Sequence, residues 1–404
     1  MGNFAGYIMP LWYKTGAKKE HLSVIKHAGL FDTSHMALIV IKGKDAKKLL
    51  QQTTCKDLDR CIGKAKKPSV SGVATYSLYM NEYGGVIDDT IIFQIDKNKY
   101  ICVVNAGMGD VISEHLRQFS SGYNLEITNL TDKVGKIDLQ GPASPKILKK
   151  ILLSHSILED MKFFNFKGYF AETFKTTSEK VLIEKNIPIM ISRTGYTGEF
   201  GFEIFVDPKY LLTLWDMLLH AGQEYRLIPC GLAARDSLRV GANLPLSHQD
   251  IGNWPFMNNP WTFVLPFDEH KTSFTKKFIG SNRLLDISEV SFTYPFVGYD
   301  LRKVDINQNA EVYNQEDMNI GKVLSCTTDS AIGRNEIGVY SVASPDKPDD
   351  LVIKGLSCGF IKTNTMIHEG TDVFLKDKRR KIKVTISKAI RPDLSGRKPI
   401  KDFL

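Results

Sequence analysis

Two adjacent aspartates, Asp88 and Asp89, follow the glycine-rich turn at Gly84-Gly85 and lie within a run of β-branched and aliphatic residues. Such a turn and run are typical of a β-hairpin, although aspartate is normally depleted in strands. Because side chains alternate between the faces of a strand, the two carboxylates point opposite ways. We expect Asp89, on the face of Ile91 and Phe93, to face an apolar interior where burial shifts its pKa. A strand-end salt bridge or turn cap would explain the pair equally well.

A second acidic residue interrupts apolar sequence in the segment from 192 to 206. Gly195, Gly198 and Gly201 allow tight turns and close approach of the backbone to a ligand. Glu203 then lies between Phe202 and an isoleucine, so it repeats the anomaly at Asp89. A glycine cluster is more often structural than functional, and no Gly-Lys-Ser/Thr follows to make a phosphate-binding P-loop.

Two arginines mark a third segment, which we expect to form a helix that begins just after Gly231. Arg235 and Arg239 are four residues apart and share a helix face, and Asp236 can pair with Arg239. One interpretation is a surface ion pair of little energetic value. The other interpretation is a guanidinium held in position to form two parallel hydrogen bonds with the carboxylate of a ligand.

The composition describes an ordinary globular protein of two or three domains. The chain has 404 residues, 43% of them hydrophobic and 24% charged, with a formal net charge of +8. The surplus of positive charge is spread over short lysine clusters and includes no arginine-rich or RNP-type motif, so we expect no nucleic-acid partner. It suits an anionic small molecule or an acidic partner protein.

The cysteines and histidines give no sign of a disulfide framework or a metal site. The 6 cysteines are dispersed without a C-x-x-C pair, and the 9 histidines show no paired spacing. No apolar run reaches membrane-spanning length, and the N-terminus lacks the basic and apolar regions of a signal peptide. We therefore expect a reduced, soluble, cytoplasmic protein without a membrane partner.

Hydrophobic periodicity predicts an α+β organisation that positions these motifs. Predicted helices cover residues 19–27, 44–52, 110–119, 145–152 and 210–220. Predicted strands cover residues 37–42, 74–80, 86–95, 100–105, 125–128 and 134–139, and the charged stretch 162–185 reads as two surface strands. Beyond about Ser291, short strands separated by polar turns predict a separate all-β domain, a barrel or a sandwich.

Taken together, the motifs resemble one family along most of the chain. They occur in order at residues 4–10, 29–36, 76–89, 103–105, 139–142, 192–203 and 231–239. In these segments the sequence is similar to the aminomethyltransferase (T-protein) of the glycine cleavage system and its folate-dependent methyltransferase relatives.

The resemblance implies a three-domain cloverleaf around a central folate cavity. Residues 1–40 and 128–245 would form a discontinuous folate-binding domain, and residues 41–127 and 246–290 a second domain that carries the Asp88-Asp89 hairpin. Residues 291–404 would form the C-terminal β-barrel. The cofactor implied is tetrahydrofolate.

The resemblance also assigns roles to the three charged motifs. Asp89 matches the family's functional aspartate, which lies beside the reacting nitrogens of the folate and is the expected catalytic residue. Glu203 matches the glutamate that accepts hydrogen bonds from the amino and ring N–H groups of the pterin. Arg235 matches an arginine of the folate site.

Further residues are assigned to the walls of the folate cavity. Tyr196 would pack beside the pterin ring, and Asn105 and Met36 match wall positions. The family also uses a residue near the end of the chain, for which Arg397 is the best-placed candidate and Arg391 the fallback.

The sequence departs from the family pattern where the one-carbon donor is expected. After Arg239 the family usually continues with an acidic residue and later Leu-Tyr-Gly, whereas this chain has a different sequence over residues 240–250, including His248. A proline-apolar-glutamate pattern that follows in the family is replaced by residues 255–257. The first hypothesis is an enzyme that transfers a one-carbon unit to tetrahydrofolate from the aminomethyl-lipoyl arm of an H-protein-like carrier and releases ammonia. The alternative is a methyltransferase or demethylase that uses a small N-, S- or O-methyl donor, which His248 could contact. A noncatalytic folate-binding protein is a third reading, although the Lys-Gly-Cys-aromatic-x-Gly-Gln-Glu motif of those relatives does not occur in the sequence.

Overall fold

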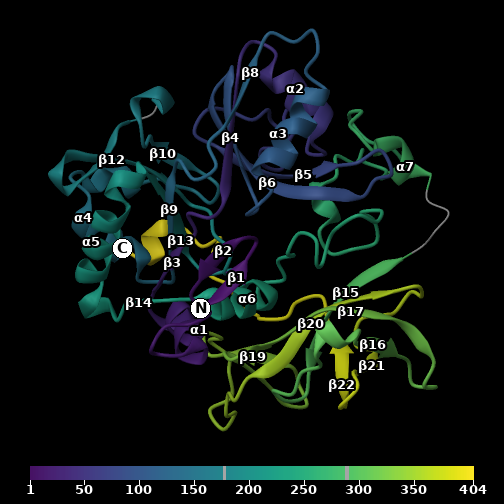
Figure 1. The fold of residues 1–404 in the computed structure, drawn as a ribbon. Coiled ribbons are helices and arrows are strands. Elements are labelled where there is room, and N and C mark those ends of the chain that lie inside the picture. The colour runs from purple at the N-terminus through teal and green to yellow at the C-terminus, as the bar shows by residue number, and fades with distance from the viewer. Residues whose placement is uncertain (176–178, 287–290) are drawn as a thin grey trace.

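Two open sheets and a closed barrel organise the chain in the computed structural model, which describes residues 1–175, 179–286 and 291–404 (Figure 1). One sheet has seven strands, the second has five, and the barrel is built from the C-terminal part of the chain. Helix α6 (Leu232–Gly241) lies close to the centre of the view, between the barrel and the two sheets. The mixed fold and the all-β C-terminal region expected from the sequence are confirmed.

The seven-stranded sheet carries the Glu203 motif on one of its inner strands. Its order is β10–β12–β13–β9–β3–β14, with β11 paired to β12. The strands are β3 (Gly29–Asp32), β9 (Gly135–Gln140), β10 (Phe166–Gly168), β11 (Val181–Ile183), β12 (Ile187–Ser192), β13 (Gly201–Val206) and β14 (Ile228–Pro229). In the register of β13 against β9, Glu203 lies opposite Asp138. The two carboxylates therefore lie side by side on one face of the sheet.

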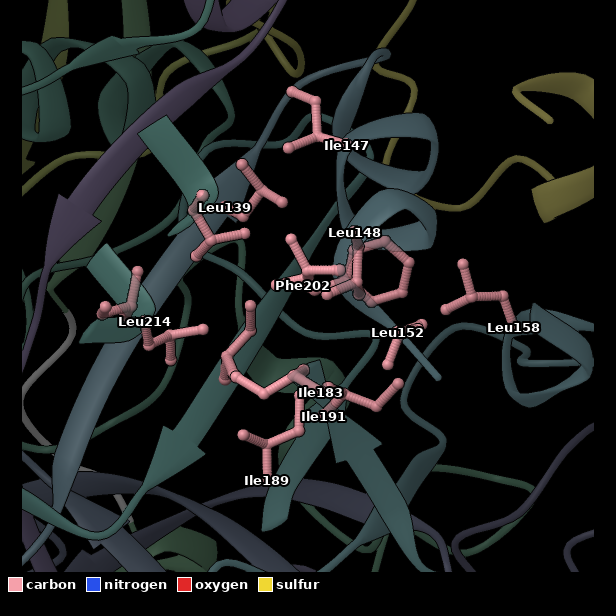
Figure 2. Close-up of a cluster of buried hydrophobic side chains, with 14 of the residues drawn as sticks. Leu139, Ile147, Leu148, Leu152, Leu158, Ile183, Ile189, Ile191, Phe202 and Leu214 are labelled. Atoms are coloured by element: carbon pink, nitrogen blue, oxygen red, sulfur yellow. The ribbon is translucent and has the colours of Figure 1, made fainter. Parts of the chain in front are cut away.

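Helices α4 (Ser144–Ile151) and α5 (Leu211–Ala221) cover one face of this sheet. Figure 2 shows how Ile147 and Leu148 of α4 and Leu214 of α5 pack toward Leu139 and Phe202 of the inner strands. These side chains are fully buried, and burying a side chain of this size contributes about 1.5–3 kcal/mol. The packing of α4 and α5 stabilises one face of the seven-stranded sheet, and its other face packs against the five-stranded sheet.

The five-stranded sheet carries the two aspartates. Its order is β5 (Ala74–Met80), β6 (Val86–Asp96), β7 (Lys99–Val104), β4 (Ala37–Lys42) and β8 (Glu126–Asn129). Helices α2 (Ala46–Thr53) and α3 (Gly109–Gln118) cover one face. On the other face, the ring of Phe93 lies 5.3 Å from that of Phe166 and 5.5 Å from that of Phe205, both from the seven-stranded sheet. Both faces of β6 are therefore packed.

The barrel closes through six antiparallel strands, in the order β15–β20–β17–β16–β21–β22. They are β15 (Phe292–Gly298), β16 (Glu311–Tyr313), β17 (Asn319–Asp329), β20 (Leu356–Thr363), β21 (Asp372–Lys376) and β22 (Lys381–Ile386). A short hairpin of β18 (Ile332–Arg334) and β19 (Val339–Ser341) stands beside it. Closure leaves no free sheet edge, which is how all-β domains avoid unwanted strand pairing.

Smaller elements complete the chain. The N-terminal hairpin β1 (Gly2–Phe4) and β2 (Tyr7–Met9) precedes α1 (Ala17–Lys26), and α7 (Ser281–Leu285) precedes the barrel.

The pairing of Arg239 with Asp236 forms as the spacing predicts, with Nε 2.9 Å from Oδ1. Arg239 is nevertheless buried and also binds Asp250, so the surface ion pair considered from the sequence is wrong.

The predicted domain division stays a prediction, although two of its boundaries fall inside strands. The boundary after residue 40 cuts β4, and the boundary after residue 127 cuts β8. Residues 287–290, at the end of the predicted second domain, and residues 176–178, within the predicted surface strands, lie outside the described residues. Among the helices that the structure describes, none is long and apolar enough to cross a membrane.

Candidate active site

A cavity of about 380 Å³ lies between the two sheets and the C-terminal segment of the chain. The seven residues that the sequence analysis selected come from distant parts of the chain, and all of them line this cavity: Met36, Asp89, Asn105, Tyr196, Glu203, Arg235 and Arg397. The volume falls within the range of about 300–1,000 Å³ that is common for small-molecule sites.

The two aspartates share one amide group. The Nδ2 atom of Asn105 lies 2.7 Å from Oδ1 of Asp88 and 2.6 Å from Oδ1 of Asp89. The backbone N–H of Asn105 donates to the second oxygen of Asp88 at 2.9 Å. The second oxygen of Asp89 accepts a hydrogen bond from the hydroxyl of Tyr76 at 3.0 Å.

Asp89 lies on the face of Ile91 and Phe93, which packs against apolar residues as expected, and burial raises its pKa. Asp88, not Asp89, is the fully enclosed carboxylate, with no exposed surface, whereas Asp89 lines the cavity. Alternation along β6 separates the two side chains as predicted. Both faces of β6 are interior, because α2 and α3 cover the face of Asp88 and the seven-stranded sheet covers the face of Asp89, with the cavity at Asp89.

Burial raises the pKa of both aspartates, and the charge of Asp88 raises the pKa of Asp89 further. Burial has the largest effect on Asp89, the neighbouring charge of Asp88 adds to it, and the pKa of Asp89 rises to about 7 despite the hydrogen bonds from Asn105 and Tyr76. Burial likewise raises the pKa of Asp88, against the opposing hydrogen bonds from Asn105. A carboxyl group with a pKa near neutrality can both accept and release a proton at physiological pH.

A buried ion network holds Glu203 on the opposite side of the cavity. The ammonium group of Lys136, which is 1% exposed, contacts Oε1 of Glu203 and lies 2.7 Å from Oδ1 of Asp138. The hydroxyl of Thr194 donates to Oε2 of Glu203. Burial raises the pKa of Asp138, but the cations of Lys136 and Arg235 outweigh it and the pKa lies below its ordinary value. Glu203 is thus held in place with both oxygens at the cavity wall.

Arg235 joins this network from helix α6. Its Nη1 atom lies 2.8 Å from Oδ2 of Asp138, and its guanidinium carbon lies 5.0 Å from the centre of the Tyr196 ring. The hydroxyl of Tyr196 donates to the carbonyl of Pro245. One lysine and one arginine balance two carboxylates, so this wall carries polar groups with no net charge.

The two candidate arginines at the end of the chain occupy different environments. Arg397 is exposed and lines the cavity, with its guanidinium carbon 5.3 Å from the ring centre of Phe163. Arg391 is buried away from the cavity and binds Oδ2 of Asp329 at 2.6 Å and Oε1 of Glu199 at 3.3 Å. Of the two, Arg397 is the one placed to reach a ligand.

Arg193 holds the segment that carries Arg397. It is 1% exposed, and its guanidinium stacks 3.4 Å above the ring centre of Phe200. Nη1 donates to the carbonyl of Gly201 at 2.8 Å, and Nη2 donates to the carbonyls of Gly396 at 3.2 Å and Lys398 at 3.4 Å. Burial lowers the pKa of Arg193 to about 10.

The stretch that departs from the family pattern lies along the same cavity. Ala242, Leu244 and Pro245, within residues 240–250, line it. Beyond that stretch Trp261 and Phe263 also line the cavity, and the ring of Phe263 lies 6.4 Å from that of Tyr76. His248 lies just outside, with Nε2 3.9 Å from Oδ1 of Asp88 and its side chain 53% exposed. Among the described residues, no group of three histidine, cysteine or acidic side chains is arranged to hold a metal ion.

Sequence reasoning missed Lys136, Asp138, Tyr76 and Arg193. The sequence did contain a signal for the first two. Lys136 and Asp138 alternate with apolar residues along β9, so the two charged side chains share one face of the strand. All residues of this strand are buried. Charged residues on the inner face of a central strand require partners. Tyr76 and Arg193 gave no such signal, since nothing in the local sequence shows what their side chains reach.

Comparison with known proteins agrees with this geometry. Residues 1–255 match the family model of the GCVT N-terminal domain. The chain is 34% identical to an aminomethyltransferase of Caldanaerobacter subterraneus over 80% of this chain and 78% of that protein. It is 32% identical to an aminomethyltransferase of Natranaerobius thermophilus over 96% of this chain and 92% of that protein.

The likeness extends to the tertiary structure. A crystal structure of the glycine cleavage system aminomethyltransferase T from Bartonella henselae superposes with a TM-score of 0.72 at 26% identity, covering 96% of this chain and 92% of that one. The sequence match and the shared fold both extend over almost the whole chain. The chain therefore belongs to the aminomethyltransferase, or T-protein, family of the glycine cleavage system.

Proposed function

We propose that this protein is a tetrahydrofolate-dependent aminomethyltransferase that takes a one-carbon unit from the aminomethyl-lipoyl arm of a carrier protein and releases ammonia. The observation that supports this most is the arrangement around Asp89. Its carboxylate lines the cavity with one oxygen bound to Asn105 and the other to Tyr76, and its pKa is raised to about 7. Across the cavity, Glu203 supplies a second, separately held acceptor.

The residues of the cavity fit tetrahydrofolate. A pterin ring presents amino and ring N–H groups, which need acceptors, and Glu203 offers two carboxylate oxygens at the wall. Tyr196 offers a flat apolar surface beside Arg235. Arg397 offers a cation near the exposed end, which suits the glutamate carboxylates of a folate.

Asp89 is the residue proposed to handle the proton. When bound, tetrahydrofolate supplies the nitrogen nucleophiles that accept the one-carbon unit. The ionised carboxylate of Asp89 orients an N–H group and takes up its proton, so the negative charge needed in the transition state is already in position. Because its pKa lies near 7, Asp89 can release the proton again near neutral pH.

Water exclusion strengthens this step. The aromatic side chains of Tyr76, Trp261 and Phe263 line the cavity, and the Tyr76 hydroxyl binds Asp89 directly. A low local dielectric increases the attraction between a carboxylate and a developing positive charge on nitrogen. We infer that these residues shield the reacting atoms from bulk water.

The donor is the less constrained part of the proposal. A net charge of +8 suits the docking of an acidic carrier, and six free thiols suit the reducing cytoplasm. A small methyl donor is the second candidate, favoured by one observation. The stretch that departs from the family pattern contributes Ala242, Leu244 and Pro245 to the cavity and brings His248 beside Asp88.

Two measurements test the proposal. Titration of tetrahydrofolate, followed by quenching of tryptophan fluorescence, should show saturable binding, and its absence at high concentration would remove both candidate functions. Ammonia release from an aminomethylated lipoyl carrier should then depend on tetrahydrofolate. If ammonia is not released but a methylamine, thioether or methyl ether is demethylated, the second candidate is correct.

A further inference from the structure

The strongest unassigned feature is the buried carboxylate behind Asp89. Asp88 has no exposed surface and does not line the cavity, so a ligand in the cavity does not touch it. It nevertheless accepts two hydrogen bonds from Asn105, one from the backbone N–H at 2.9 Å and one from Nδ2 at 2.7 Å. A buried carboxylate is costly, so the arrangement calls for a reason other than stability.

These contacts fix the direction of the Asn105 side chain. Carboxylate oxygens only accept hydrogen bonds when ionised, so the atom between Asp88 and Asp89 must be the amide nitrogen. Both of its hydrogens are then committed, at 2.7 Å to Asp88 and at 2.6 Å to Asp89. The hydrogen bond that Nδ2 donates to Asp88 thus orients the amide so that its second hydrogen points at Asp89.

Asp88 also acts on Asp89 through its charge. The two carboxylates lie on consecutive residues and meet at one amide nitrogen, inside a water-poor region where charges interact strongly. The repulsion from Asp88 is the second largest cause, after burial, of the raised pKa of Asp89. Groups placed in this way titrate as a pair.

We propose that Asp88 is a positioning residue that holds the Asn105 amide against Asp89 and sets the pH range in which Asp89 exchanges its proton. This rests on the proposed function, because the relevant proton is the one that Asp89 takes up during transfer. Among the residues that the structure describes, the other ionisable groups that face the pair are Tyr76 and Tyr196 beside Asp89, Tyr79 opposite Asp88 on β5, and His248 at the outer end.

The pH dependence of turnover tests this role. Replacing Asp88 by asparagine removes the repelling charge, so the acid limb of kcat/KM against pH should move down by about one pH unit. The control is Asp110→Asn on α3, since Asp110 also accepts a hydrogen bond from an asparagine, at 2.8 Å from Asn129, but does not line the cavity. Its acid limb should not move. A uniform loss of turnover in Asp88→Asn with the limb in place would indicate a merely structural residue and overturn the proposal.

A second measurement depends neither on the Asp88→Asn variant nor on the donor. In the unsubstituted protein labelled with ¹³C at the aspartate carboxyl carbons, the two carboxyl resonances should titrate in two coupled steps. Assignment follows from Asp89→Asn, in which the upper step should disappear. Independent single steps for the two groups would refute the coupling. Coupled steps in a protein without aminomethyltransferase activity would refute the proposed function alone.

Discussion

Replacing Lys136 by methionine should destabilise the fold more than almost any other single change at the cavity. The ammonium group is 1% exposed and serves two carboxylates, Asp138 at 2.7 Å and Glu203. Methionine keeps much of the volume but leaves Glu203 without a counterion and Asp138 with only Arg235, at 2.8 Å. Removing one partner of a buried ion pair costs about 3–5 kcal/mol, which is a large share of a typical unfolding free energy of about 5–15 kcal/mol.

The loss of folding stability in Lys136→Met should depend on pH in a defined direction. Lys136 and Arg235 hold the pKa of Asp138 below its ordinary value in the folded protein. A carboxyl group with a lowered folded-state pKa stabilises the protein above its unfolded pKa, and that contribution disappears as the pH falls through the folded value. The difference in unfolding free energy between the original protein and Lys136→Met should therefore have its full value at pH 7 and become smaller below about pH 4.

Urea unfolding, followed by tryptophan fluorescence and circular dichroism at pH 7, measures the effect. The matched control is Lys149→Met on α4, an exposed lysine whose replacement should change the unfolding free energy by no more than about 0.5 kcal/mol. The double variant Lys136→Met/Glu203→Gln keeps the pair of Asp138 and Arg235 and should recover part of the loss. A loss below about 1 kcal/mol for Lys136→Met at pH 7 would refute the view that this lysine compensates two buried charges.

Three further substitutions test the assignments at the cavity. Asp89→Asn preserves the shape of the site, so tetrahydrofolate titration should show unchanged affinity while turnover falls by about 10²–10⁴-fold; equal turnover would defeat the proposed proton transfer. Glu203→Ala removes a charged acceptor and should weaken tetrahydrofolate binding by about tenfold or more, whereas an unchanged dissociation constant would show that the pterin lies elsewhere. Arg193→Met frees the carbonyls of Gly396 and Lys398, so trypsin should cleave after Arg397 faster than in the original protein; the same cleavage rate would show that Arg193 does not hold the tail.

The elements of the fold were largely predictable from the sequence because their signals are local. The apolar spacing of 210–220 predicts a helix, and α5 covers residues 211–221. The Gly84-Gly85 turn with flanking β-branched residues predicts a hairpin, and β5 and β6 form it. The short strands and polar turns beyond residue 291 predict an all-β domain, and the barrel confirms it. Each pattern depends only on neighbours within a few residues.

The boundaries between structural units were less predictable, because they depend on strand pairing. Strand β4 begins at Ala37 and pairs with β7 and β8, so the five-stranded sheet reaches into the range assigned to the first domain. A strand joins whichever sheet offers it partners. The local sequence predicts only that the segment forms a strand and does not predict which strands it pairs with.

The amino-acid sequence by itself determined which acidic and basic residues are unusual. Asp89 and Glu203 stand out because charged groups in apolar sequence must find partners or ligands, and Arg235 stands out by its helical spacing from Arg239; all three line one cavity. Tertiary structure alone decided what those partners are. Lys136 reaches Glu203 from the neighbouring strand, and the Asn105 amide lies between two carboxylates. Whether Asp88 or Asp89 meets a ligand depends on which face of β6 borders a cavity, and alternation along one strand carries no information about what packs against each face.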